Sequence, residues 1–144
     1  MPVLDPVRHP RVLVGTDIVA VERLSRLIAE QPEIAAEIFT AREIAYCEGR
    51  RRRNEHLAAR FAAKEAVLKA LGTGLGRGMR WTDVEVVNQI NGRPEVRLHG
   101  VVQAVARTCG MRHIDISLSH VPGLALASTA LVCDPLDTEG TTEG

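Results

Sequence analysis

The chain has 144 residues, of which 45% are hydrophobic, and its 18 basic and 18 acidic side chains give a formal net charge of zero. This length and composition predict one globular domain with a buried core, and the balanced charge argues against a general nucleic-acid or membrane-surface binder. Aromatic residues make up only 3%, which leaves few rings to stack on nucleotide bases. No stretch approaches the roughly 18 uninterrupted apolar residues of a membrane span.

The three cysteines of the chain, Cys47, Cys109 and Cys133, are far apart and odd in number. Since none of the pairs has the spacing of a metal-ligand or redox motif, we interpret all three as reduced thiols. Reduced thiols are typical of the cytoplasm, where disulfides are rare, so we expect a cytoplasmic protein.

The two ends of the chain differ in composition from the part between them. Residues 1–10 contain three prolines and no apolar run, which predicts a flexible lead rather than a signal peptide. Residues 133–144 lose the hydrophobic residues that a packed core requires, and we expect a disordered tail there. One folded domain should therefore span residues 11–132.

The first half of this domain is predicted to contain one strand followed by helices. Residues 11–19 form a short β-branched apolar run that indicates a buried strand, and the apolar spacing in residues 21–28 predicts a helix. Thr40 and Glu43 have the three-residue spacing of a capping box, which begins a second helix that ends near Gly49.

The longest predicted helix spans residues 55–71. A basic run, Arg50–Arg53, precedes this helix and is predicted to be a loop. Asn54 can cap the first turn, and Gly72 supplies the C-terminal stop.

The second half of the domain alternates in the pattern of strands. Asn91 and Gly92 lie between two such runs and predict a hairpin, while residues 101–109 have helical spacing. The predicted strands are residues 84–88, 95–98, 113–119 and 124–132. The resulting order, β-α-α-α-β-β-α-β-β, predicts an α+β fold with helices packed on an antiparallel sheet.

Charged side chains share two lines of the long helix. Helical spacing places Arg60 and Lys64 on one line, and Glu65 and Lys69 on another. An exposed helix face with ordinary ion pairs, each worth roughly a few tenths of a kcal/mol, also explains this pattern. This pattern alone favours a solvated helix face, so a functional role for these residues needs support from other features of the sequence.

Three further features indicate phosphate chemistry. The long helix runs into a glycine-rich loop, residues 72–78, whose backbone can approach a phosphate closely. Asp17 lies at the end of an apolar strand, where a carboxylate needs a partner or a metal, and residues 117–120 end another strand with His120. Magnesium binds one or two carboxylates together with substrate phosphates, so Asp17 and Glu65 are candidate ligands. Spacing alone does not show that these carboxylates meet.

Four motifs resemble those of the holo-acyl-carrier-protein synthases, the short stand-alone members of the phosphopantetheinyl transferase family. They follow in the family's order: Gly15-Thr-Asp-Ile18, Arg60-Phe-Ala-Ala-Lys-Glu-Ala66, Lys69-Ala-Leu-Gly-Thr-Gly74 and Ser117-Leu-Ser-His120. Phe39-Thr40 with Glu43 and the predicted hairpin are also similar, and the resemblance covers about residues 12–132. It implies a phosphopantetheinyl-transferase-like fold, in which an antiparallel sheet packs against a long helix.

The resemblance also implies a reaction. The serine hydroxyl of an apo acyl carrier protein attacks the pyrophosphate of coenzyme A, phosphopantetheine is transferred and adenosine 3′,5′-bisphosphate leaves, in the service of fatty acid biosynthesis. The implied metal is Mg2+, held by Asp17 and Glu65, with Lys69 offsetting the charge that develops on the transferred phosphate. Either Glu65 or a magnesium-bound water could deprotonate the serine.

The same resemblance implies where coenzyme A binds. The implied coenzyme-binding residues are Arg60, Lys64, Gly72, Gly74, Ser119 and His120, and His120 joins Glu65 and Lys69 in the implied catalytic set. We expect Arg51, in the basic run, to bind the adenosine 3′-phosphate. A solvated arginine run explains that segment almost as well.

A docking surface and an oligomeric state follow from the resemblance too. Carrier proteins are acidic, and Arg23 and Arg26 match the family's basic docking surface. Glu22, Glu30 and Glu33 lie close by and depart from a strongly basic helix. Family members of this length form homotrimers with each active site between two subunits, which we expect here.

Three other functions are compatible with parts of the sequence. A transferase or binding enzyme for another phosphate-bearing nucleotide would use the same site. A small nucleic-acid-binding domain would use Arg50–Arg53 and Lys64, and the neutral charge and scarce aromatics count against it. An inactive trimeric scaffold would have no need for the set Asp17, Glu65, Lys69 and His120.

Overall fold

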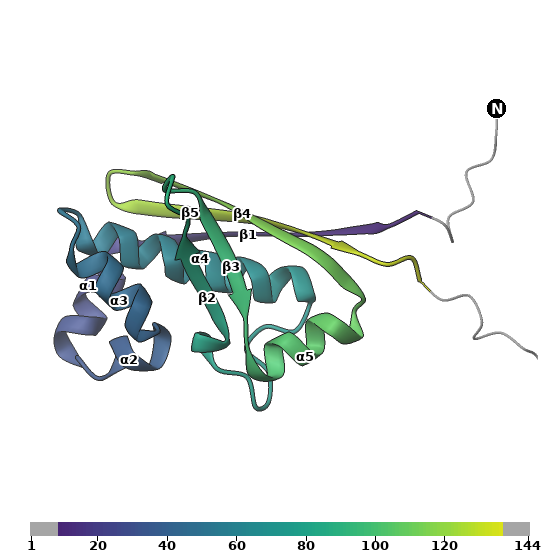
Figure 1. Cartoon of the computed structure of the whole chain (residues 1–144). Helices are drawn as coiled ribbons and strands as arrows, with labels where there is room; N and C mark the ends of the chain where they lie inside the picture. Colours follow the sequence, from purple (N-terminus) through teal and green to yellow (C-terminus); the bar gives the residue numbers. More distant parts are fainter. Residues whose placement is uncertain (1–8, 137–144) are drawn as a thin grey trace, which may run out of the picture.

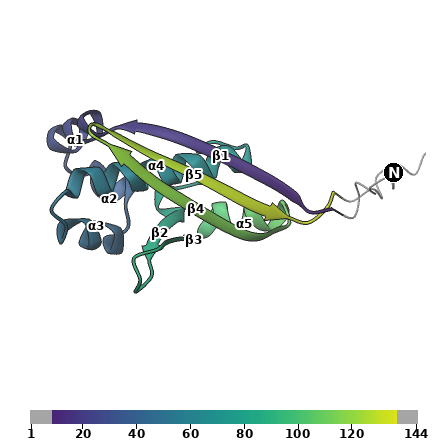
Figure 2. The ribbon, with the colours of Figure 1, turned by 90° about the horizontal axis from the view of Figure 1, so that it is seen from above.

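The computed structural model describes residues 9–136. A three-stranded antiparallel sheet, in the order β1-β5-β4, lies against the longest helix of the fold (Figure 1). The strands are β1 (Arg11–Ala20), β4 (Met111–Val121) and β5 (Leu124–Cys133), and the helix is α4 (Arg53–Leu71). Seen from above, α4 runs along one face of the sheet (Figure 2). The predicted α+β class, with an antiparallel sheet packed against a long helix, is confirmed.

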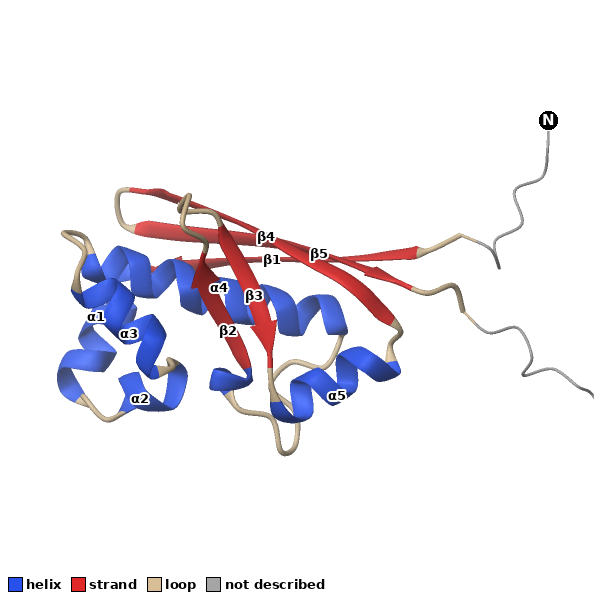
Figure 3. Cartoon of the chain, in the orientation of Figure 1, coloured by secondary structure: helices blue, strands red, loops and turns tan. Residues whose placement is uncertain are grey.

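The remaining elements lie on the α4 side of the sheet (Figure 3). Three helices gather at the end where β4 turns into β5: α1 (Val21–Glu30), α2 (Ile34–Ile38) and α3 (Ala41–Glu48). A short 3-10 helix, η1, leads into an antiparallel hairpin and a last helix; these are η1 (Trp81–Asp83), β2 (Val84–Asn88), β3 (Pro94–Leu98) and α5 (Gly100–Thr108). Among the described residues, no helix has the length and apolar character that crossing a membrane requires.

Strand β1 lies very close to α4 at Gly15. Ala62, Ala63 and Ala66 of the helix are completely buried, and a Cβ on Gly15 would lie only 1.9 Å from the carbonyl oxygen of Ala66. A glycine opposite small helix residues is what permits this approach, because a close-packed core has no room for an added carbon here. The contact holds the middle of β1, which includes Asp17, against the C-terminal half of α4.

The ends of α4 only partly match the sequence prediction. The prediction that Asn54 caps this helix is wrong, because the helix begins at Arg53 and Arg52 occupies the N-cap position. The Asn54 side-chain oxygen instead accepts a hydrogen bond from Nη1 of Arg53 at 3.0 Å. Gly72 adopts the left-handed conformation, with φ of 77°, and ends the helix as predicted.

Two other parts of the fold depart from expectation. The sequence patterns predict no helix at α2, because its five residues are too few to display a helical period. Strand β5 ends at the buried residue Cys133, and the Asp134 amide donates to the Gly110 carbonyl at 2.8 Å. The folded domain therefore extends beyond residue 132, and the tail was predicted to begin too early. The predicted lead up to residue 8 and the tail from residue 137 lie outside the described residues.

The Gly15 contact yields a prediction about stability. We expect Gly15→Ala to lower the free energy of unfolding by about 3 kcal/mol, because the added methyl group must push β1 away from α4. Urea denaturation followed by circular dichroism measures this loss.

Gly49→Ala is a suitable control, because the nearest atom to an added Cβ there is 3.8 Å away and its φ is −77°. A Gly15→Ala protein as stable as the Gly49→Ala control would contradict the importance of this close approach.

Candidate active site

Two carboxylates and an amine come together where β1 lies against α4. Nζ of Lys69 lies 2.7 Å from Oδ1 of Asp17 and 3.1 Å from the carbonyl oxygen of Thr16. Glu65 is half-buried one helical turn before Lys69. Burial raises the pKa of Glu65, the Asp17 carboxylate raises that pKa further, and Lys69 offsets part of the effect. The fold therefore joins Asp17, Glu65 and Lys69, which we call the carboxylate–lysine cluster.

The donor set of this cluster suits a metal ion that is completed by substrate. Within residues 9–136 no group of three or more His, Cys, Asp or Glu side chains could hold a metal without help. Mg2+ is bound by one or two carboxylates, with waters and substrate phosphates filling its other positions. Asp17 and Glu65 therefore fit Mg2+, and they do not fit a metal that needs a full set of protein ligands.

A cleft of about 930 Å³ opens beside α4 and reaches β1 at Gly15 and Thr16, directly before Asp17. It lies between the N-terminal half of α4, the tip of the β2–β3 hairpin and the strands of the sheet. Its lining combines the basic residues Arg52, Arg60, Arg93 and His120 with the acidic residues Glu55 and Asp115. Arg52 lies 3.7 Å from Glu55, and Arg93 lies 2.7 Å from Asp115. Of the cluster, none of Asp17, Glu65 and Lys69 is among the described residues that line it. Arg60 and Glu65 are five residues apart, which places them roughly 140° apart around the helix.

Arg60 forms part of the cleft wall although its side chain is almost completely buried, at 1% exposure. Its guanidinium lies 4.3 Å from the centre of the Tyr46 ring, donates to the His56 carbonyl at 3.3 Å and donates to the Asn88 side-chain oxygen. Its Nε is buried without a hydrogen-bond partner among the described residues. The fold thus fixes a positive charge at the wall of the cleft, and coenzyme binding by Arg60 stays a prediction.

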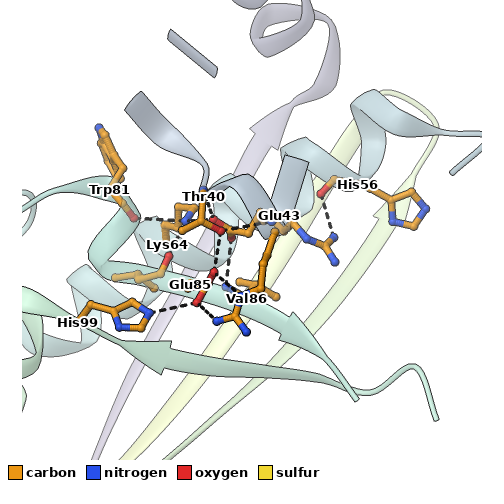
Figure 4. Close-up of polar contacts among 11 residues, drawn as sticks. Thr40, Glu43, His56, Lys64, Trp81, Glu85, Val86 and His99 are labelled. Atoms are coloured by element: carbon orange, nitrogen blue, oxygen red, sulfur yellow. Dashed lines mark hydrogen bonds and ion pairs between the residues drawn. The ribbon is translucent and has the colours of Figure 1, made fainter. Parts of the chain in front are cut away.

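Lys64, which was expected to line the coenzyme site, lies instead inside the protein. Its side chain has 0% exposure and lies outside the cleft lining. Nζ donates to Oε1 of Glu43 at 2.7 Å, to the Trp81 carbonyl at 3.2 Å and to the Val84 carbonyl (Figure 4). Because an ammonium has three N–H bonds, all of its donors are used inside the protein. Burial lowers the pKa of Lys64, and Glu43 partly restores it.

Glu43 is the buried centre of this arrangement. Its Oε1 also accepts from the Thr40 amide at 2.9 Å, and the Glu43 amide donates to Oγ1 of Thr40 at 3.2 Å, which confirms the predicted capping box. Oε2 accepts from the Val86 amide at 3.1 Å. The pair Glu43–Lys64 therefore ties α3 and α4 to β2. The sequence identified Glu43 as a capping residue and missed its role as a buried ionic partner.

Glu85 adds a second carboxylate next to this pair (Figure 4). It accepts from Oγ1 of Thr40 at 2.7 Å and from Nη2 of Arg42 at 2.6 Å, and it lies 3.0 Å from Nε2 of His99. Burial opposes its ionisation, but the hydrogen bonds from Arg42, Thr40 and His99 prevail and lower the pKa to about 2. Glu85 is therefore ionised near neutral pH and strengthens the connection between α3 and β2.

Of the predicted coenzyme-binding residues His120, Arg51 and Ser119, His120 lines the cleft and the other two do not. His120 lies in the cleft, with Nε2 3.7 Å from Oε2 of Glu55. In the basic run, Arg52 lines the cleft and Arg51 does not, so the expectation that Arg51 binds there is not supported by its position. Ser119 is exposed next to His120 and outside the lining.

The cleft also contains groups that the sequence did not indicate. His56 lines it, and burial lowers the pKa of this imidazole, with Arg60 and Arg50 lowering it further. The Tyr46 ring packs edge-on against His56, with 6.1 Å between the ring centres. A single histidine or tyrosine carries no pattern in the sequence, and only the fold groups these two rings with Arg60.

The glycines predicted to bind the coenzyme and the arginines predicted to dock the carrier protein lie outside the cleft lining. Gly72 and Gly74 follow Lys69 with positive φ, and an added Cβ on either would meet no described atom within 4 Å. Arg23 and Arg26 are exposed on α1, which follows β1 directly. Arg26 donates to Glu22 at 3.0 Å, so an acidic neighbour already engages part of this basic surface.

Comparison with known proteins identifies the family of this chain. The family model of the 4′-phosphopantetheinyl transferase superfamily matches residues 13–122. The chain belongs to this superfamily. The matched segment contains the carboxylate–lysine cluster and all of α4 and β4, so the superfamily's pattern spans the cluster and most of the cleft.

Named relatives agree with this assignment. A holo-[acyl-carrier-protein] synthase of Moorella thermoacetica is 48% identical over 126 residues, which cover 88% of this chain and 97% of that protein. The crystal structure of holo-[acyl-carrier-protein] synthase from Neisseria meningitidis has a TM-score of 0.76 at 28% identity, over 83% of this chain and 96% of its own. The Bacillus anthracis holo-(acyl-carrier-protein) synthase in complex with CoA (3',5'-ADP) has a TM-score of 0.72 at 29% identity, over 87% of this chain and 99% of its own. The resemblance inferred from the motifs is confirmed.

The buried ion pair yields a stability prediction. We expect Lys64→Met to cost about 3–5 kcal/mol of unfolding free energy, because it leaves the Glu43 carboxylate buried without its cation. The double variant Glu43→Gln/Lys64→Met should be more stable than Lys64→Met alone, since the unpaired charge is removed while Gln keeps a carbonyl acceptor.

Urea denaturation of the two variants and the parent protein measures both effects. A loss below about 1 kcal/mol for Lys64→Met, the size typical of exposed pairs, would contradict a buried structural role for this lysine.

Proposed function

We propose that the chain transfers the phosphopantetheine arm of coenzyme A to a serine hydroxyl of an apo acyl carrier protein and releases adenosine 3′,5′-bisphosphate. The observation that carries this proposal is the pair of sites on α4: a carboxylate–lysine cluster suited to a metal and phosphates, and a cationic cleft suited to a nucleotide. Relatives that are holo-acyl-carrier-protein synthases, one of them in complex with CoA (3',5'-ADP), support the choice of substrates. Fatty acid biosynthesis is the pathway that such a carrier serves.

In this proposal Asp17 and Glu65 hold Mg2+. The ion, when bound, polarises the pyrophosphate of the coenzyme and offsets charge on its oxygens. Lys69 contributes a further positive charge as the bond to the leaving bisphosphate breaks. Asp17 lies on a strand that the Gly15 contact holds against α4, so the two carboxylates keep their spacing while substrate binds.

The cleft is proposed to bind the adenosine end of the coenzyme. Its volume of about 930 Å³ lies in the range of natural small-molecule sites. Arg52 and Arg60 supply positive charge there that can offset phosphate groups, and the His120 ring can hydrogen-bond to them. Arg52 replaces Arg51 as the candidate for the 3′-phosphate, because it is the member of the basic run that reaches the cleft.

We propose that a homotrimer completes each active site. None of Asp17, Glu65 and Lys69 lines the cleft of its own subunit, and in the trimer the cleft of one subunit would meet the cluster of its neighbour. The sheet face away from α4 carries an exposed apolar row on β1, with Val12 60%, Val14 71% and Ile18 57% exposed. Burying such a row against another copy is favourable, because apolar surface gains free energy when it leaves water.

Carrier-protein docking is proposed on α1. Arg23 and Arg26 are exposed on this helix, which begins one residue after β1 ends and therefore lies near the cluster. Attraction between these arginines and an acidic carrier would mainly speed and orient encounter. The three free cysteines of the described chain are compatible with the reducing cytoplasm as the place of action.

The experiment that tests the proposal is the intact mass of an apo acyl carrier protein after incubation with this protein, coenzyme A and Mg2+. We expect a gain of one phosphopantetheine, and no gain when a chelator is present. The absence of any gain with several apo carriers would contradict the proposal, and stabilisation by a different nucleotide would then indicate another phosphate-bearing substrate.

The variant Glu65→Gln tests the metal assignment in the same assay. This variant removes a carboxylate ligand at nearly constant size, so we expect transfer to fall by at least about a hundredfold while the thermal midpoint stays near that of the parent. Glu37→Gln, an exposed change on α2, is the matched control and should retain full activity. Near-normal transfer by Glu65→Gln would contradict the metal assignment.

A further inference from the structure

The Lys69 ammonium is bound directly to the Asp17 carboxylate. Nζ lies 2.7 Å from Oδ1 of Asp17, and the Thr16 carbonyl, 3.1 Å away, accepts a second hydrogen bond. A divalent cation bound at Asp17 would lie next to this positive charge, and like charges at such a distance repel strongly. The residue assigned to the substrate phosphate is therefore also the present partner of a proposed metal ligand.

The two members of this pair differ in their freedom to move. The Asp17 side chain is 16% exposed and belongs to a strand pressed against α4, whereas Lys69 is 53% exposed in the last turn of that helix. An ion pair with a half-exposed member contributes little net stability. The flexible lysine stem can therefore leave at small cost, while the carboxylate stays in place.

The charges of the cluster favour such an exchange. Asp17 and Glu65 are two carboxylates, and Lys69 is the cation of the same cluster, one helical turn after Glu65 and with Nζ 2.7 Å from Oδ1 of Asp17. Two carboxylates thus share a single ammonium in this cluster, so their negative charge is only partly balanced. A divalent ion would supply more positive charge than the ammonium that it replaces.

We propose that Lys69 and the divalent cation compete for Asp17, so that the cation displaces the ammonium and thereby frees it to bind the phosphate of the coenzyme. This inference rests on the proposed function, because it takes Asp17 and Glu65 as the metal ligands. It gives Lys69 a second role: the lysine lowers the metal affinity of the free protein and becomes available to substrate only when metal is bound.

Direct metal binding tests this competition. Mn2+ is titrated into the full chain without coenzyme, and free Mn2+ is followed by electron paramagnetic resonance. We expect Lys69→Met to bind Mn2+ about tenfold more tightly than the parent protein, because a unit positive charge next to the ion has been removed. Arg107→Met removes an equal charge from the exposed side of α5 and should leave the affinity unchanged.

The composition of the chain allows a second readout. Lys64 and Lys69 are its only lysines, since all of the other basic residues are arginine. A protein labelled with 13C,15N-lysine therefore gives two sets of side-chain signals, and buried Lys64 provides an internal reference. We expect Mg2+ to shift the ε and ζ signals of Lys69 and to leave those of Lys64 in place. In Asp17→Asn the Lys69 signals should already be displaced before Mg2+ is added.

The possible outcomes separate the inference from the proposed function. Equal Mn2+ affinity in the parent and Lys69→Met, or Lys69 signals that do not move at saturating Mg2+, would overturn the competition while leaving the metal site intact. Failure of both proteins to bind Mn2+ would overturn the metal site itself, and the competition with it.

Discussion

Strand β1 approaches helix α4 so closely at Gly15 that a Cβ there would lie 1.9 Å from the Ala66 carbonyl oxygen. The site depends on this approach, because its carboxylates come from the two elements that meet there. Asp17 follows Gly15 by two residues, and Glu65 precedes Ala66 directly. Small residues at the contact thus bring two like charges together at a half-buried place, and Lys69 compensates them. Burial raises the pKa of Glu65, and the nearby Asp17 carboxylate raises that pKa further.

The other side of α4 shows how the same helix is held. Arg60 and Lys64 occur on one helical line, and both are almost fully buried. Lys64 is bound to Glu43 and to backbone carbonyls of η1 and β2, while Arg60 lies over Tyr46. All three donors of Lys64 find acceptors, whereas Arg60 is held by the Tyr46 ring, the His56 carbonyl and Asn88 and keeps a buried Nε without a partner among the described residues. These two cations fix α4 between α3 and β2, whereas Glu65 and Lys69 lie on another line of the helix, toward Asp17.

The features that were predicted correctly from the sequence are those whose geometry depends on residues close together in the chain. The capping box of Thr40 and Glu43 and the left-handed stop at Gly72 depend on local backbone geometry, so their spacing suffices. Lys64 was misassigned because lysine is rarely buried without a partner, and its partner Glu43 is 21 residues away. Likewise, spacing could group Glu65 with Lys69 but could not bring Asp17 to them; the family motifs suggested that meeting, and the Gly15 contact explains it. Arg52 and Arg51 are indistinguishable in a basic run, and only the course of the chain into α4 decides which one reaches the cleft.

The central claim is that Asp17 and Glu65, joined across the contact of β1 and α4, form a metal site completed by the coenzyme. The most direct test is the anomalous scattering of Mn2+ in a crystal of the protein grown with coenzyme A. The account predicts one strong peak between the two carboxylates, beside a pyrophosphate whose adenosine end lies in the cleft of an adjacent subunit. A peak away from both carboxylates, or a coenzyme whose pyrophosphate lies far from them, would contradict it.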